Sequence, residues 1–163
     1  MPEKAVEKKK DLSSVSEDGL IHLGNRCVGV ITAEWNPEVT FAMRDAAIDF
    51  LHQYIEPDNI ISLLVPGSFE LVNAAARMLS SENIDGVIAI GCVIQGETPH
   101  FTFISQAVAN GIADLNISTG KPVIFGVLTT NTPEQALERA GGKHGNKGTE
   151  AAAALVKMLN FDF

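Results

Sequence analysis

From residue 26 onward, short unbroken apolar runs alternate with segments in which apolar residues recur every three or four positions. The runs are typical of strands buried on both faces, and they predict strands at 27–31, 60–65, 86–94 and 123–128. The intervening spacings predict helices at 43–54, 71–81, 101–115, 133–140 and 149–159. Strands that alternate with helices form crossovers and a parallel sheet. We therefore predict an α/β fold: a three-layer sandwich with a central four-stranded parallel sheet.

The chain is long enough for one domain with a hydrophobic core, since it has 163 residues of which 45% are hydrophobic. We expect a flexible N-terminal tail over 1–22, where charged residues mix with Ser and Gly, and a single domain over 23–163. The lysine run at 8–10 has two interpretations, a solvated charge run or a site that recruits a partner. No apolar stretch reaches the ~20 residues of a membrane span, and the N-terminus lacks the apolar region of a secretory signal.

Charge and cysteine content narrow the class of protein further. The formal net charge is -8, which argues against a nucleic-acid binder, because phosphate backbones attract clustered Lys and Arg. Cys27 and Cys92 both lie inside apolar runs, which indicates reduced core residues rather than a disulfide and favours a cytoplasmic location. No cysteine or histidine cluster has the spacing of a metal site, so we expect none.

Three of the four predicted strands end in Asn or Thr directly before Pro, at Asn36, Thr98 and Thr132. Asn and Thr side chains accept hydrogen bonds from the first N–H groups of a helix, and Pro suits the first helical position. We expect all three residues to cap helices, and Gln135 to complete a capping box with Thr132. Helix capping alone explains why these residues occur at the three strand ends, so the pattern by itself does not indicate a binding or catalytic role.

The turn after the third strand carries residues that capping does not explain. Thr98 as a cap places His100 in the first helical turn, where the helix dipole disfavours a second positive charge and biases the imidazole towards its neutral form. Gly96 lets the backbone approach a ligand, and the N–H groups beside Thr98 suit a phosphate. Ligands bind beyond the carboxyl ends of parallel strands, so His100 is either a proton-transfer residue or a structural histidine.

The first two strand ends also have two interpretations each. Ser68 is expected to cap the second helix, and Glu70 lies in its first turn, where the dipole favours a carboxylate. Glu70 either stabilises this helix or accepts hydrogen bonds from ligand hydroxyls. Trp35, the only tryptophan, is either buried or stacks on a planar ring.

A segment rich in Gly and positive charge, ERAGGKHGNKG at 138–148, joins the last two helices. Arg139 and Lys147 in it have the chemistry to bind an anion, although basic residues and Gly are also normal at a helix C-terminus. The segment lacks the spacing GxxxxGK[ST] of nucleotide triphosphate loops.

Five motifs together resemble the 6,7-dimethyl-8-ribityllumazine synthase family: AEWNPEVT, VPGSFEL, IGCVIQGETPHF, KPVIFGVLTT and EQALERAGGKHGNKG. The resemblance covers residues 28–159 and implies a flavodoxin-like topology. It implies a transferase of riboflavin biosynthesis that condenses 5-amino-6-(D-ribitylamino)uracil with 3,4-dihydroxy-2-butanone 4-phosphate, releasing phosphate and water. The family uses no metal and no organic cofactor. The resemblance further implies two small-molecule substrates as partners and neither nucleic acid nor membrane.

The resemblance also implies roles for individual residues, with His100 as the proton-transfer histidine. Phosphate contacts fall on Gly96, Glu97, Thr98 and Arg139. Contacts to the uracil ring and the ribityl chain fall on Trp35, Asn36, Ser68, Phe69, Glu70, Val93, Ile94, Phe125 and Lys147. In the family, the residues matched by Phe125, Arg139 and Lys147 come from the adjacent subunit.

Three positions depart from the family pattern: Gln95 replaces a common Arg or Lys, Thr102 a common acid, and Val72 a common Pro. The family assembles as homo-oligomers, pentamers that in some members form shells of sixty subunits, and riboflavin synthase is a possible partner. The short loop over 141–148 favours the shell. Two rival functions remain, a carrier of flavin-like ligands and a flavodoxin-like electron carrier.

Overall fold

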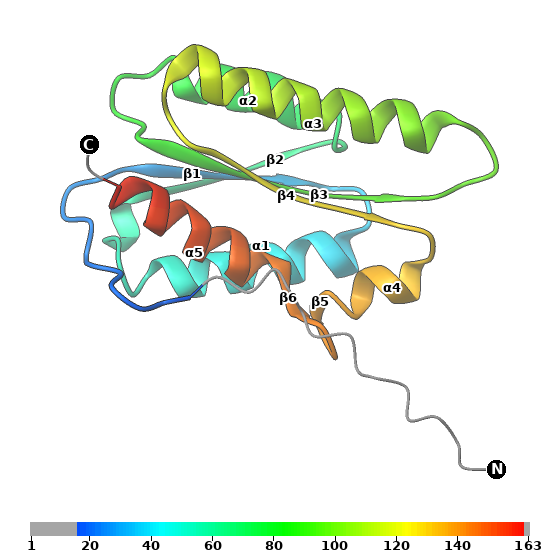
Figure 1. The fold of residues 1–163 in the computed structure, drawn as a ribbon, viewed down its shortest axis with the longest axis horizontal. Coiled ribbons are helices and arrows are strands. Elements are labelled where there is room, and N and C mark those ends of the chain that lie inside the picture. Colours follow the sequence, from blue (N-terminus) through cyan, green and yellow to red (C-terminus); the bar gives the residue numbers. More distant parts are fainter. Residues whose placement is uncertain (1–15, 162–163) are drawn as a thin grey trace, which may run out of the picture.

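The computed structural model describes residues 16–161 of the chain, and four parallel strands form its centre. The strands lie side by side in the order β2-β1-β3-β4 (Figure 1). Their bounds are β1 (Val28–Ala33), β2 (Ile60–Val65), β3 (Gly86–Ile94) and β4 (Val123–Thr130). All three strand pairings are parallel, which confirms the predicted four-stranded parallel sheet.

Helices cover both faces of this sheet, so the predicted three-layer, flavodoxin-like arrangement is confirmed (Figure 1). Helices α2 (Glu70–Leu79) and α3 (His100–Thr119) lie on one face, and α1 (Pro37–Leu51) and α5 (Lys147–Leu159) on the other. The remaining elements are a short helix α4 (Pro133–Leu137), the 3₁₀ turn Pro57–Asn59, and a small hairpin of β5 (Ala140–Gly142) and β6 (Gly145–Asn146). Neither the hairpin nor the 3₁₀ turn was predicted.

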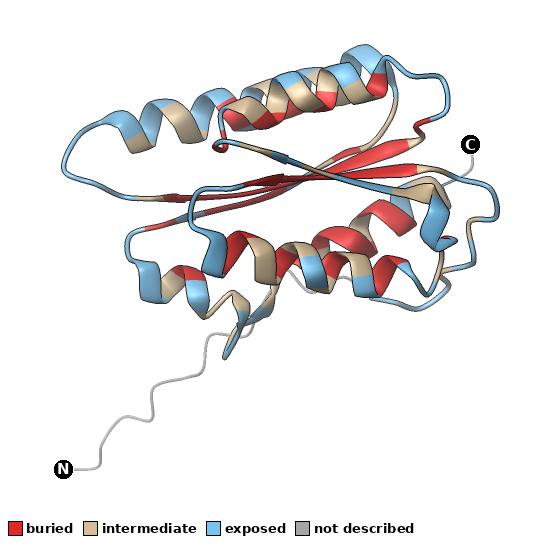
Figure 2. Cartoon of the chain, turned by 180° about the vertical axis from the view of Figure 1, so that it is seen from behind, coloured by how far each residue is buried: buried red, intermediate tan, exposed pale blue. Residues whose placement is uncertain are grey.

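Two hydrophobic cores lie between the layers, one on each face of the sheet (Figure 2). Val30, Ile88 and Ile90 point towards α1 and α5, whereas Ile31 and Val87 point towards α2 and α3. Neighbouring residues of a strand face opposite sides, so a strand covered on both sides must be apolar throughout. This requirement explains the apolar runs of β1 and β3, which are almost wholly buried, but not that of β2, whose residues are exposed or half-buried.

Helix capping follows the prediction at only one of the three Asn-Pro and Thr-Pro sites. The hydroxyl of Thr132 accepts a hydrogen bond from the backbone N–H of Gln135 at 3.3 Å, which confirms this cap. The side chain of Gln135 reaches back as predicted, but it accepts from the N–H of Asn131 at 2.9 Å instead of from the cap residue itself.

The capping prediction is wrong at Asn36, Thr98 and Ser68. Asn36 has a left-handed backbone (φ 58°), and its side-chain amide donates to the carbonyl of Cys92 on β3 at 3.0 Å. Helix α3 begins after Pro99, whose carbonyl accepts the first helical hydrogen bonds, so Thr98 lies outside the helix. Ser68 precedes Phe69 at the start of α2, and its hydroxyl makes no hydrogen bond to any described residue.

Part of the predicted tail contacts the domain. Leu20 packs against the α1–α5 core, and the N–H of Ile21 donates to the side-chain oxygen of Asn160 at 3.3 Å. Residues 1–15, including the lysine run at 8–10, lie outside the described part of the chain. Within the described part, no helix is both long and apolar enough to cross a membrane.

Candidate functional site

The carboxyl ends of β1, β2 and β3 meet the start of α3 around a cleft of about 390 Å³. The topology brings these ends together, since parallel strands end at the same edge of the sheet. Of the lining residues, only Cys92 and Ile104 were not among the predicted site residues. The cleft is lined by Trp35, Asn36, Ser68, Phe69, Glu70, Cys92, Val93, Ile94, His100 and Ile104.

The loop after β1 supplies an aromatic ring and an amide to the cleft. Two backbone hydrogen bonds join this loop to the loop after β2: Glu34 N–H to Val65 O at 2.8 Å and Trp35 N–H to Pro66 O at 3.1 Å. Trp35 is 63% exposed, so the interpretation of a buried tryptophan is wrong. The amide of Asn36 ties the same loop to β3, and an exposed flat ring on a fixed loop suits stacking on a planar ligand.

The loop after β2 supplies a carboxylate and a second exposed aromatic ring. One oxygen of Glu70, Oε2, accepts a hydrogen bond from the N–H of Gly67 at 2.9 Å, and Oε1 has no hydrogen bond to a described residue. Phe69 is exposed beside it. Ser68 is 5% exposed, and its hydroxyl lies next to Gly91 on β3. The loop therefore offers a partly buried acceptor, Glu70 Oε1, at the edge of the cleft.

The end of β3 and the start of α3 form a third side of the cleft. Val93 and Ile94 are the last residues of β3, and His100 is the first residue of α3, where it is exposed. The turn between them is braced by Gln95, whose side-chain amide donates to the carbonyl of Gly96 at 2.8 Å. The first turn of a helix leaves backbone N–H groups without partners within the helix, which suits an anion beside His100.

Six predicted site residues do not line this cleft. Gly96, Glu97 and Thr98 form the exposed turn that precedes α3, and Phe125 is 42% exposed on β4. Arg139 follows α4, and Lys147 is the first residue of α5.

Main-chain and side-chain bonds hold Arg139, which follows α4, and Lys147, which begins α5. The N–H of Lys147 donates to the carbonyl of Arg139 at 2.9 Å. The guanidinium of Arg139 donates to the carbonyl of Gln135 at 2.8 Å, and the ammonium of Lys147 pairs with Glu150 at 2.7 Å. Within one chain, these two cations and the cleft occupy different places.

Two titratable groups near these regions have shifted pKa values. Burial raises the pKa of the Cys92 thiol to about 11, so this cleft residue is a neutral thiol near pH 7. A hydrogen bond from Lys143, with Nζ 2.7 Å from Oε1, lowers the pKa of the Glu138 carboxyl. Among the described residues, no group of three or more His, Cys, Asp or Glu side chains is arranged to hold a metal ion.

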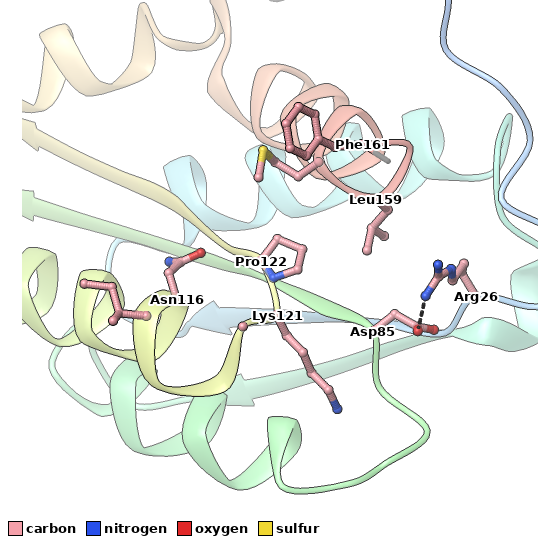
Figure 3. A pocket seen from close by; sticks show the side chains of 10 residues that line it. Arg26, Asp85, Asn116, Lys121, Pro122, Leu159 and Phe161 are labelled. Atoms are coloured by element: carbon pink, nitrogen blue, oxygen red, sulfur yellow. Dashed lines mark hydrogen bonds and ion pairs between the residues drawn. The ribbon is translucent and has the colours of Figure 1, made fainter. Parts of the chain in front are cut away.

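A larger hollow of about 500 Å³ lies at the opposite, amino-terminal edge of the sheet (Figure 3). Its polar side chains already have partners in the protein: Arg26 pairs with Asp85 at 2.7 Å, and the ammonium of Lys121 donates to the carbonyl of Ser81 at 3.0 Å. None of the predicted site residues lines it. The carboxyl-edge cleft is therefore the better candidate for the functional site.

The fold and the cleft define a flavodoxin-like α/β protein with a candidate binding site at the carboxyl edge of its sheet. The particular family comes from comparison with known proteins. The family model of 6,7-dimethyl-8-ribityllumazine synthase matches residues 25–162. The chain belongs to the 6,7-dimethyl-8-ribityllumazine synthase family, whose members are enzymes of riboflavin biosynthesis.

Individual relatives support the same assignment over nearly the whole chain. The 6,7-dimethyl-8-ribityllumazine synthase of Cytophaga hutchinsonii is 50% identical over 151 residues, which are 92% of this chain and 94% of that protein. The enzyme of the same name from Porphyromonas gingivalis is 52% identical over 136 residues, 83% of this chain and 84% of that protein. The one from Flavobacterium johnsoniae is 47% identical over 150 residues, 91% of this chain and 79% of that protein.

Proposed function

We propose that the chain condenses 5-amino-6-(D-ribitylamino)uracil with 3,4-dihydroxy-2-butanone 4-phosphate to give 6,7-dimethyl-8-ribityllumazine, phosphate and water. The observation that carries this proposal is the carboxyl-edge cleft, which combines an exposed indole, a carboxylate oxygen without a hydrogen bond to any described residue, and a histidine at a helix start. Holding two substrates side by side in one cleft is itself a large contribution to the rate. No metal and no organic cofactor takes part in the proposed reaction.

The uracil substrate is assigned to the inner part of the cleft. The indole of Trp35 stacks on the pyrimidine ring, and the backbones of Val93 and Ile94 at the end of β3 bind the ring edge. The Oε1 atom of Glu70 accepts hydrogen bonds from ribityl hydroxyls, because its partner Oε2 is already bound to Gly67. Asn36, Ser68 and Phe69 complete the contacts around the ring and the chain.

Proton transfer is assigned to His100. In the proposed sequence the 5-amino group attacks the ketone and a first water leaves as an imine forms. Phosphate is then eliminated, and the ribitylamino nitrogen attacks the remaining carbonyl group and closes the ring with loss of a second water. Each of these steps moves a proton, and an imidazole exchanges protons readily near neutral pH. His100 is exposed at the start of α3, within reach of a substrate that fills the cleft.

The phosphate group is assigned to the turn formed by Gly96, Glu97 and Thr98, next to the first turn of α3. Backbone N–H groups at a helix start favour an anion, and an Arg side chain adds a charge-assisted pair. Arg139 is that arginine in this proposal, whereas Lys147 and Phe125 complete the uracil side. Since Arg139, Lys147 and Phe125 are absent from the lining of the cleft in one chain, we assign them to the cleft of an adjacent subunit.

The proposed assembly is a homo-oligomer with active sites between adjacent subunits, built from pentamers in the cytoplasm. The hairpin of β5 and β6 closes the segment between α4 and α5 with few residues, which favours a shell of sixty subunits over separate pentamers. Riboflavin synthase is the proposed protein partner. Light scattering of the purified protein distinguishes the two sizes directly.

The test of the reaction is to incubate the pure protein with both substrates and to follow the fluorescence of the lumazine product. Product formation that requires both substrates is the expected result. Tight binding of the lumazine without any turnover would instead favour a carrier of flavin-like ligands. Copurification of a flavin, seen as yellow colour, would favour an electron carrier.

A further inference from the structure

The indole ring of Trp35 lies directly against the backbone of Gly67, on the loop that follows the neighbouring strand β2. A Cβ atom built on Gly67 would come within 2.5 Å of both Cε3 and Cζ3 of Trp35. Carbon atoms in contact lie ~3.5–4.0 Å apart, so a methyl group here cannot coexist with the indole in its present place. Gly67 is buried, although Trp35 itself is largely exposed.

Gly67 also holds the carboxylate of Glu70. Its N–H donates to Oε2 at 2.9 Å, and the added Cβ would lie 3.2 Å from that oxygen. The backbone torsion does not require glycine, since Gly67 is not among the glycines with positive φ. The glycine is therefore required by the space that the indole occupies and not by the conformation of the turn.

The hydrogen bonds between the two loops fix the main chain of Trp35 but not its side-chain torsions. The ring direction therefore depends on the surface against which the indole lies, and that surface includes the bare backbone of Gly67. The rest of the indole faces the cleft and solvent. A side chain at position 67 would turn the ring away from its present plane.

We propose that Gly67 is a positioning residue for the uracil substrate: its missing side chain sets the plane of the Trp35 indole while its N–H sets the Glu70 carboxylate. The proposal rests on the proposed function in assigning the stacked ring and the polyol chain to these two side chains. One buried glycine thereby fixes the relative arrangement of an aromatic surface and an acceptor.

The test compares Gly67→Ala with the unmodified protein by two readouts. Trp35 is the only tryptophan, so the emission maximum and its quenching by acrylamide report on this ring alone. We expect the emission to change and the KM for the uracil substrate to rise between about twofold and tenfold. A rise of this size corresponds to the loss of one aromatic stacking contact. The KM for the phosphate substrate should stay within about twofold of its original value. Unchanged emission together with an unchanged uracil KM would overturn the proposal.

A matched control adds the same methyl group elsewhere. Gly24→Ala places the methyl group at the amino-terminal edge of the sheet, where nothing lies within 4 Å of it. Because Gly24 has a positive φ, alanine strains the backbone there, so this variant controls for general destabilisation. It should leave both the emission and the uracil KM unchanged. In a Trp35→Ala background, Gly67→Ala should cause no further rise in uracil KM, and an equal rise in both backgrounds would show that Gly67 acts by another route.

A measurement on the unmodified protein covers the case in which Gly67→Ala fails to fold. Time-resolved fluorescence anisotropy should show an indole that rotates with the whole molecule, and rapid independent rotation would overturn the proposal. If the unmodified protein makes no lumazine, the proposed function fails, whereas the emission and anisotropy readouts still decide whether Gly67 positions the ring.

Discussion

Replacing Gly148 by Ala should destabilise the protein, although alanine is the better helix former. Gly148 lies in the first turn of α5, where this helix crosses α1. A Cβ atom at this position would lie 1.8 Å from the carbonyl oxygen of Met43 and 2.5 Å from its carbonyl carbon. These are backbone atoms of α1, so no side-chain rotation can relieve the overlap, and the two helices must move apart.

The sign of the effect follows from two opposing magnitudes. Replacing Gly by Ala in a helix stabilises by about 1 kcal/mol, whereas overpacking a core costs about 1–3 kcal/mol. We place the cost near the upper end, about 3 kcal/mol, because Met43, Ala152 and Leu155 in the core that α1 and α5 cover are fully buried and would lose contact. The net loss of about 2 kcal/mol corresponds to a melting temperature lower by about 4–8 °C for a chain of this size.

The assay is thermal unfolding followed by circular dichroism at one protein concentration, because assembly makes the melting temperature depend on concentration. Gly96→Ala is the matched control, since nothing lies within 4 Å of its added Cβ and its φ is not positive. Its melting temperature should change by less than about 2 °C. A melting temperature of Gly148→Ala equal to or above that of the unmodified protein would refute the close approach of α5 to α1.

Three further substitutions test separate parts of the molecule. His100→Ala should lower kcat by about 100-fold or more while the KM values change little, and an unchanged kcat would make His100 merely structural. Arg139→Ala should raise the KM for the phosphate substrate by about tenfold, and an equal loss for the uracil substrate would contradict its assignment. The side chain of Asn116 accepts a hydrogen bond from the N–H of Val123 and donates one to its carbonyl, both at 2.9 Å. Asn116→Leu removes both bonds and leaves the buried N–H of Val123 unpaired. It should cost about 2–3 kcal/mol in urea unfolding, and a loss below about 0.5 kcal/mol would show that these bonds do not hold α3 to β4.

Local sequence patterns predicted the sheet because its strands are apolar runs, and in β1 and β3 this pattern reflects burial on both faces. They failed at Asn36 and Thr98 for a different reason. The same Asn-Pro or Thr-Pro pattern occurs at Thr132, where the side chain does cap its helix. The amide of Asn36 instead binds the carbonyl of Cys92, a residue of the neighbouring strand, and only the strand order makes these two residues adjacent. A pattern of adjacent residues contains no information about that distant partner.

The rule that ligands bind at the carboxyl edge pointed to Trp35, Glu70 and His100, and the family resemblance added the other predicted residues of the cleft. The two lining residues that both missed are instructive. Ile104 lies four residues after His100 in α3, so helical spacing places both side chains on one face. This signal was present in the sequence. Cys92 was predicted to be a reduced core residue, and it is buried as well as adjacent to the cleft. A residue can therefore belong to the core and to the wall of a site at the same time.

The separation of Arg139 from His100 leads to a last prediction about how the site is completed. Arg139 lies between α4 and α5 and is hydrogen-bonded to Lys147 at the start of α5, whereas the cleft is built from the loops after β1, β2 and β3 together with α3. If the arginine of one subunit serves the histidine of the next, a ring of identical subunits repeats one such interface around its axis.

Two impaired variants should then complement each other. His100→Ala and Arg139→Ala are dissociated, mixed in equal amounts and reassembled, and the activity per site is measured at subsaturating phosphate substrate. Random mixing places an intact histidine against an intact arginine at about one interface in four, so about a quarter of the original activity should return. Reassembly of each variant alone is the control, and neither should exceed about a tenth of the original activity. Mixtures no more active than the average of the two variants would show that each chain completes its own site, because a site formed within one subunit gains nothing from its neighbour.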